Sequence, residues 1–103
     1  ARPSDALASA LRDEAEGADI LMVKPGLPAL DVLSKLSQLI PSKPWAVYQV
    51  SGEFAGVELL ASQNLINGPK AHTESWIAFK RAGASMIISY GARFAKQWIQ
   101  EWT

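Results

Sequence analysis

The sequence contains no cysteine and only one histidine, His72. The absence of thiols excludes disulfide bonds and any thiolate metal site within these residues. A zinc site would therefore need carboxylates, or another chain, to complete its ligands. His72 lies among polar residues at the start of an expected helix, and we predict that it is a surface residue.

The chain also lacks a charge excess and a long hydrophobic run. Ten basic residues balance ten acidic ones, so there is no electrostatic footprint for nucleic acid or for an anionic membrane surface. No apolar run approaches the roughly 20 residues that a membrane helix needs. Residues 1–19 lack the apolar core of a signal peptide, which predicts an intracellular protein unless a targeting segment precedes them.

Three short apolar segments predict strands, at residues 18–23, 45–50 and 84–89. The first and third are almost continuous apolar runs, as expected of parallel strands that helices cover on both faces. Hydrophobic residues make up 49% of the chain and charged residues 19%, which is typical of a globular protein. The sequence therefore predicts an α/β fold.

Helical patterns surround these strands. One runs from Ser4 to Gly17, a second forms an apolar stripe over residues 29–40, and two more occupy residues 54–62 and 70–82, separated by the breaker at residues 67–69. A last helix follows the third strand. The order αβαβαβα predicts parallel strands joined by right-handed crossovers.

The number of strands leaves two architectures open. A closed barrel takes eight strands and about 250 residues, so three strands form either a small open sheet or a slice of a barrel. No internal repeat, low-complexity tract or long linker divides the chain. We expect residues 1–103 to belong to one domain.

Polar side chains converge where the three strands end. The carboxyl ends of parallel strands meet at one edge of the sheet, where reactive groups gather in such folds. Here they bring together Lys24, Ser51 and Tyr90.

These residues have both reactive and plainer interpretations. An amine against apolar walls favours its neutral form and becomes a nucleophile for carbonyl carbons. Spacing alone favours plainer roles: a solvated lysine, an ordinary Ser-Gly turn and a tyrosine that caps the core. Glu53 reads as an acid that stabilises a helix N-terminus.

Three stretches resemble the signatures of the porphobilinogen synthase (5-aminolevulinate dehydratase) family. They are EGADILMVKPGLPALDVL at residues 16–33, AVYQVSGEFA at residues 46–55, and FKRAGASMIISYGA at residues 79–92. They stand in the family's order and cover nearly the whole chain, and the M-V-K-P-G and Y-Q-V-S-G-E runs are very specific. From these stretches the chain is identified as a C-terminal portion of a family member.

The resemblance implies a lyase that joins two 5-aminolevulinate molecules, with loss of two waters, into porphobilinogen for haem and chlorophyll synthesis. It implies that residues 1–103 are the last three βα units of a (β/α)8 TIM barrel, part of a single catalytic domain. Lys24 falls on an active-site lysine that forms a Schiff base with substrate. Ser51 and Tyr90 fall on positions whose hydroxyls bind a substrate carboxylate, and Tyr48 on an aromatic residue lining the same pocket.

The family's remaining machinery is expected upstream of these residues. This comprises a second lysine, the ligands for zinc or magnesium, a lid and the arm that builds a homo-oligomer of octamer or hexamer type. We therefore expect this chain alone to be an inactive fragment. Residues 16–33 and Gln49 are similar to plant, algal or apicomplexan members, which implies a location in the plastid or the cytoplasm.

Several positions depart from the family pattern. Ala29 and Gly91 stand where aromatic residues are usual, Gly56 replaces a usual methionine, and Ser9 stands where magnesium-activated members carry a glutamate. Residues 57–76 are unlike the family consensus. These departures keep an alternative open, in which the chain is a divergent, non-catalytic structural segment of such a barrel. Another barrel of the class I aldolase type would require the Y-Q-V-S-G-E match to be accidental.

Overall fold

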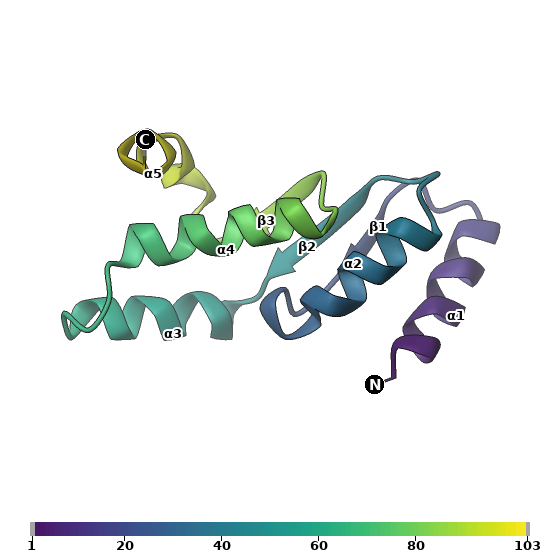
Figure 1. Cartoon of the computed structure of the whole chain (residues 1–103), viewed down its shortest axis with the longest axis horizontal. Helices are drawn as coiled ribbons and strands as arrows, with labels where there is room; N and C mark the ends of the chain where they lie inside the picture. Colours follow the sequence, from purple (N-terminus) through teal and green to yellow (C-terminus); the bar gives the residue numbers. More distant parts are fainter. Residues whose placement is uncertain (1, 103) are drawn as a thin grey trace.

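The computed structural model describes residues 2–102, which form a three-stranded sheet with its helices (Figure 1). In chain order, the elements are α1 (Pro3–Ala15), β1 (Leu21–Val23), the 3-10 helix η1 (Leu27–Ala29), α2 (Leu30–Leu39), β2 (Trp45–Gln49), α3 (Ser51–Ser62), α4 (Gly68–Ala82), β3 (Met86–Ser89), the 3-10 helix η2 (Ala92–Phe94) and α5 (Ala95–Trp102). The expected α/β class is confirmed. None of the helices among these residues is both long and apolar enough to cross a membrane.

The sheet is parallel, with strand order β1-β2-β3. Its register aligns Val23 with Val47 and Val47 with Ile87. The strands are neighbours in the sheet in the same order as in the chain. When such strands are joined by right-handed crossovers, the connecting helices all lie on the same side of the sheet. The carboxyl ends of all three strands therefore lie along one edge, and α2 and α4 lie against one another beside the sheet.

Two strands begin later than the sequence predicts. The amide of Ala18 donates to the carbonyl of Asp13, and the amide of Ala84 donates to that of Phe79. These bonds close the ends of α1 and α4, where Gly17 and Gly83 adopt φ of +100° and +117°. The residues predicted as strand starts thus complete helix C-termini instead, because the last carbonyls of a helix need donors.

The two faces of the sheet differ in cover. On one face, Val47 packs with the fully buried Leu33 of α2 and Phe79 of α4 in the main core. On the other face, Met22 is 47% exposed and Ile88 is 43% exposed. The prediction of strands buried on both faces is therefore wrong for β1 and β3, because both crossover helices cover the same face, whereas the central strand β2 is buried along most of its length. We call the two sides the covered face and the open face.

Helices α3 and α4 form a hairpin that extends beyond the sheet (Figure 1). The predicted breaker between them is confirmed at Asn67, which caps α4 by accepting a hydrogen bond from the Lys70 amide at 3.0 Å, whereas Gly68 and Pro69 already belong to the first turn of α4. Helix α3 starts at Ser51 rather than at the predicted Phe54. Ser51 and Gly52 are therefore the first residues of a helix and not a separate turn.

Candidate active site

Three of the four candidate residues lie at the carboxyl edge of the sheet. Lys24 directly follows β1, Tyr90 directly follows β3, and Ser51 begins α3 two residues after the end of β2. The parallel register brings these strand ends to the same edge. Tyr48 lies inside β2, where it pairs with Ile88.

Tyr48 and Tyr90 form the best-defined contact of the site. Side chains alternate between faces along a strand, and Tyr48 pairs with Ile88, two residues before Tyr90, so both tyrosines belong to the open face. Their hydroxyl oxygens lie 3.2 Å apart, within hydrogen-bonding distance, and the ring of Phe54 lies 6.1 Å from that of Tyr90. The hydrogen bond with Tyr90 raises the pKa of Tyr48 above its ordinary value of 10.0. The Tyr48 phenol therefore keeps its proton at neutral pH and can donate it in a hydrogen bond.

Lys24 lies apart from the tyrosine pair. Its side chain is exposed and lines a cavity of about 480 Å³ between α1, β1 and α2, which Asp13 and Asp31 also line. Within the part of the chain that the structure describes, no hydrogen bond or ion pair links Lys24 to Tyr48, Ser51 or Tyr90. Residues 2–102 therefore leave the Lys24 side chain exposed and do not enclose it.

Ser51 is exposed in the first turn of α3. Its neighbourhood is organised by Glu53, which lies two residues later and is half-buried. The Glu53 carboxylate accepts hydrogen bonds from the backbone amides of Val50, Gly26 and Leu27. The interpretation of Glu53 as an acid at a helix N-terminus is thus confirmed for α3, but it misses the two amides from the segment after Lys24.

The covered face contains a polar network that sequence reasoning missed. The side-chain oxygen of Gln49 accepts hydrogen bonds from Trp76 Nε1 at 3.2 Å and from the Ser89 hydroxyl at 2.6 Å. The side-chain nitrogen of Gln49 lies 3.3 Å from His72 Nδ1. A polar residue such as Gln49 inside an apolar strand was the available signal, because buried amides require partners.

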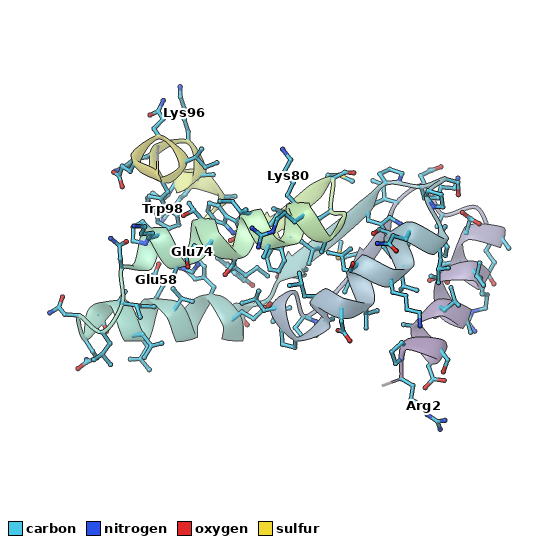
Figure 2. All side chains as sticks on the ribbon, viewed as in Figure 1. Arg2, Glu58, Glu74, Lys80, Lys96 and Trp98 are labelled. Carbon is cyan, nitrogen blue, oxygen red and sulfur yellow. The ribbon has the colours of Figure 1, made fainter. Side chains whose placement is uncertain are left out.

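The prediction that His72 is a surface residue is wrong. Its side chain is fully buried and stacks on the rings of Phe54 and Trp98, with centroids 4.6 and 5.4 Å away. Figure 2 shows Trp98 reaching from α5 toward α4, while Glu58 reaches toward α4 from α3. Burial lowers the pKa of His72, and the Glu58 carboxylate, 3.7 Å from Nε2, partly opposes that shift. The helical hairpin and α5 cover this position, which local polarity does not reveal.

Neither a metal cluster nor a second candidate pocket adds to this site. Among residues 2–102, no three His, Asp or Glu side chains are grouped so that they could hold a metal ion. A second cavity of about 370 Å³ lies between α4, β3 and α5 and is lined mostly by apolar side chains. It contains none of the four candidate residues.

Comparison with known proteins gives a consistent result. The family model described as delta-aminolevulinic acid dehydratase matches residues 1–98. The chloroplastic delta-aminolevulinic acid dehydratase of Chlamydomonas reinhardtii is 44% identical over 95 residues, which are 92% of this chain and 24% of that relative. The Helicobacter pylori enzyme of the same name is 47% identical over 93 residues, 90% of this chain and 28% of that relative.

The fold has a close match among solved structures. The crystal structure of delta-aminolevulinic acid dehydratase (porphobilinogen synthase) from Toxoplasma gondii, in complex with the reaction product porphobilinogen, superposes with a TM-score of 0.90 at 40% identity. The match covers 98% of this chain and 29% of that one. The chain thus spans about a quarter of the length of the curated relatives it matches.

Proposed function

The chain belongs to the delta-aminolevulinic acid dehydratase family, and we propose that the intact protein is a porphobilinogen synthase. It joins two 5-aminolevulinate molecules into porphobilinogen with loss of two waters. The observation that carries this proposal is the convergence of Lys24, Ser51 and Tyr90 at one edge of a parallel sheet. The porphobilinogen bound in the similar Toxoplasma gondii structure supports the choice of product.

The proposed chemistry begins at the Nζ atom of Lys24. The neutral amine attacks the keto carbon of 5-aminolevulinate, and loss of one water leaves an imine that is protonated on nitrogen. This imine withdraws electrons, so it eases attack at its carbon and proton loss from the neighbouring carbon. Joining the second substrate and closing the ring releases the other water and returns the Lys24 amine. Because Lys24 is exposed here, other parts of the intact protein must enclose it.

The hydroxyl groups hold substrate in this proposal. Phenol and serine hydroxyls donate hydrogen bonds that are stronger when the acceptor is a carboxylate. Tyr90 and Ser51 donate to a carboxylate of 5-aminolevulinate, and Tyr48 lines the same pocket. The 3.2 Å contact between the hydroxyl oxygens of Tyr48 and Tyr90 supports placing these two residues in one pocket.

The surroundings of the site follow from the same proposal. Residues 1–103 form the last three βα units of a (β/α)8 TIM barrel within one catalytic domain. The enzyme is a homo-oligomer of octamer or hexamer type in the plastid or cytoplasm, the plastid being supported by the chloroplastic Chlamydomonas reinhardtii relative. Residues 2–102 offer no metal cluster, so zinc or magnesium takes its ligands elsewhere and no step is assigned to a metal held by them.

Reductive trapping tests the role of Lys24. The intact protein is treated with borohydride in the presence of 5-aminolevulinate, digested, and the modified lysine is located by mass spectrometry. Adduct at Lys24 is expected, because reduction fixes an imine as a stable amine. Lys24→Ala should remove this adduct, whereas the matched control Lys96→Ala should retain it, since Lys96 points away from the rest of the molecule (Figure 2).

Two results would contradict the proposed role of Lys24. Adduct on other lysines with Lys24 unmodified would remove Lys24 from the mechanism. Unchanged porphobilinogen formation in a folded Lys24→Ala protein would do the same. Either result would favour the alternative of a divergent, non-catalytic structural segment.

A further inference from the structure

We infer that Glu53 is a positioning residue for Lys24, because its carboxylate ties the backbone after Lys24 to the start of α3. The inference rests on the proposed function, since it gives Glu53 a task in the Lys24 reaction. Glu53 does not touch the amine itself. It acts through the peptide segment that carries the amine.

Three backbone amides from two parts of the chain meet at this carboxylate. Its Oε2 atom accepts from the amides of Val50 and Gly26, both at 2.9 Å, and its Oε1 atom accepts from the amide of Leu27 at 2.7 Å. A carboxylate has about four lone-pair sites, so three of them are in use. Gly26 lies two residues after Lys24 in sequence and 27 residues before Glu53.

The pattern goes beyond an ordinary helix cap. Capping α3 requires only the bond to Val50, at the residue that precedes the helix. The other two amides belong to the start of η1, where helical N–H groups have no partner within the helix. Glu53 therefore satisfies the N-termini of two helices, η1 and α3, which α2 and β2 separate in the chain, and this couples the loop after β1 to the loop after β2.

Packing fixes the same segment from a second direction. Gly26 is buried, and a Cβ atom at this position would lie 2.5 Å from the Phe79 ring, closer than real contacts allow. Phe79 is itself fully buried in the core. The backbone two residues beyond Lys24 is thus held between the Glu53 carboxylate and the Phe79 ring.

The location of Lys24 explains why such a tether affects the reaction. Strand β1 has three residues and lies at an edge of the described sheet, and the Lys24 side chain has no hydrogen-bonding or ionic partner among residues 2–102. Among these residues, few other contacts therefore determine where the amine lies. A displacement of about 1 Å at a reacting group can lower a rate about a hundredfold.

The test compares Glu53→Ala, Glu53→Gln and Asn67→Ala in the intact protein. Asn67→Ala is the matched control, because it removes the cap of α4 without touching the segment after Lys24. Hydrogen exchange at the Gly26 and Leu27 amides measures the tether. The rate of borohydride trapping at Lys24, with kcat and KM, measures the position of the amine, and denaturant unfolding measures stability.

We expect Glu53→Ala to speed exchange at both amides and to slow trapping at Lys24 about 10-fold to 100-fold. The reduction should appear in kcat more than in KM. Glu53→Gln keeps one acceptor oxygen and should fall between Glu53→Ala and the unsubstituted protein; it also serves if Glu53→Ala does not fold. Asn67→Ala should lower stability with trapping unchanged.

The outcomes separate this inference from the proposed function. Without adduct at Lys24 in the unsubstituted protein, the Lys24 step of the proposed function fails, whatever the exchange data show. With that adduct present, the inference is overturned if exchange at Gly26 and Leu27 is the same in folded Glu53 variants. It is also overturned if those variants trap substrate as fast as Asn67→Ala does.

Discussion

The covered and open faces of the sheet carry different kinds of residue. On the covered face, Val47, Leu33 and Phe79 are fully buried, and the Gln49 side chain satisfies its polar atoms with Trp76, Ser89 and His72. On the open face, Met22 and Ile88 remain exposed and the two tyrosines meet each other. Most polar groups of the covered face thus have partners within residues 2–102, with His72 Nε2 as an exception, whereas the open face presents groups that have room to meet a ligand.

This difference separates stability from proposed chemistry. Substitutions on the covered face should act mainly through the free energy of unfolding, because they remove buried contacts. Substitutions at the carboxyl edge and on the open face should act mainly through turnover, because they touch exposed groups. The variants below test that division.

The largest effect is expected at Lys24. Lys24→Ala should lower porphobilinogen formation by at least about a thousandfold, because it removes the group that forms the covalent bond with substrate. The free energy of unfolding should change far less than turnover does, since the Lys24 side chain makes no hydrogen bond or ion pair with residues 2–102 that would be lost. Steady-state assay and urea unfolding of the intact protein measure both quantities. A large loss of stability would show that Lys24 belongs with the structural residues.

A core leucine provides the opposite test. Leu33→Ala should lower the free energy of unfolding by about 2 to 5 kcal/mol, because the side chain is fully buried between α2 and the sheet. Its effect on kcat should be small while the protein remains folded. Leu39→Ala is the matched control, since it makes the same change in the same helix at an exposed position. Equal losses for the two variants would contradict the division between the faces.

Much of the covered face was predictable from the sequence. The apolar runs around Leu21, Val47 and Ile87 predict parallel strands, and the stripe at residues 29–40 predicts α2, since these patterns repeat with the period of each element. The strand starts were not predictable, because Ala18 and Ala84 supply amides to helix ends. That choice depends on hydrogen bonds across a turn, which apolar content does not encode.

The site was predictable in position more than in contacts. The strand order places Lys24, Ser51 and Tyr90 at one edge, which follows from a parallel topology. The bonds from the amides of Gly26 and Leu27 to Glu53 span 27 and 26 positions of the sequence. A pattern of neighbouring residues therefore cannot predict them. The burial of His72 likewise depends on the packing of three helices around it.

Removal of one tyrosine hydroxyl should have an intermediate effect. Tyr90→Phe should raise KM for 5-aminolevulinate about tenfold, because a hydrogen bond to a charged group contributes about 1.5 to 3 kcal/mol. It should also lower the pKa of Tyr48 toward the ordinary value of 10.0, since the hydrogen bond with Tyr90 is the main cause of its rise.

Ultraviolet difference titration of Tyr90→Phe against Tyr48→Phe measures that pKa. The variant that keeps Tyr48 should titrate it at lower pH than the unsubstituted protein does. An unchanged KM in both variants would show that the open-face tyrosines do not bind substrate. Lys24 would then be the remaining candidate for chemistry at the carboxyl edge.

The smallest effect is expected from His72, and it should depend on pH. Burial lowers the pKa of His72 below its ordinary value of 6.5, so the folded state binds this proton less readily than the unfolded state does. The contribution of His72 to stability is therefore complete above about pH 6.5 and is lost as pH falls through the lowered folded pKa. His72→Gln should make the free energy of unfolding depend less on pH in that acid range, as measured by urea unfolding from pH 7.5 downward.

Glu58→Gln is the control that identifies the cause. It removes the carboxylate that opposes the shift of the His72 pKa, so the acid loss of stability should become steeper. An acid profile identical in all three proteins would show that this buried ring does not titrate on unfolding, and the covered face would then owe its pH dependence to other groups.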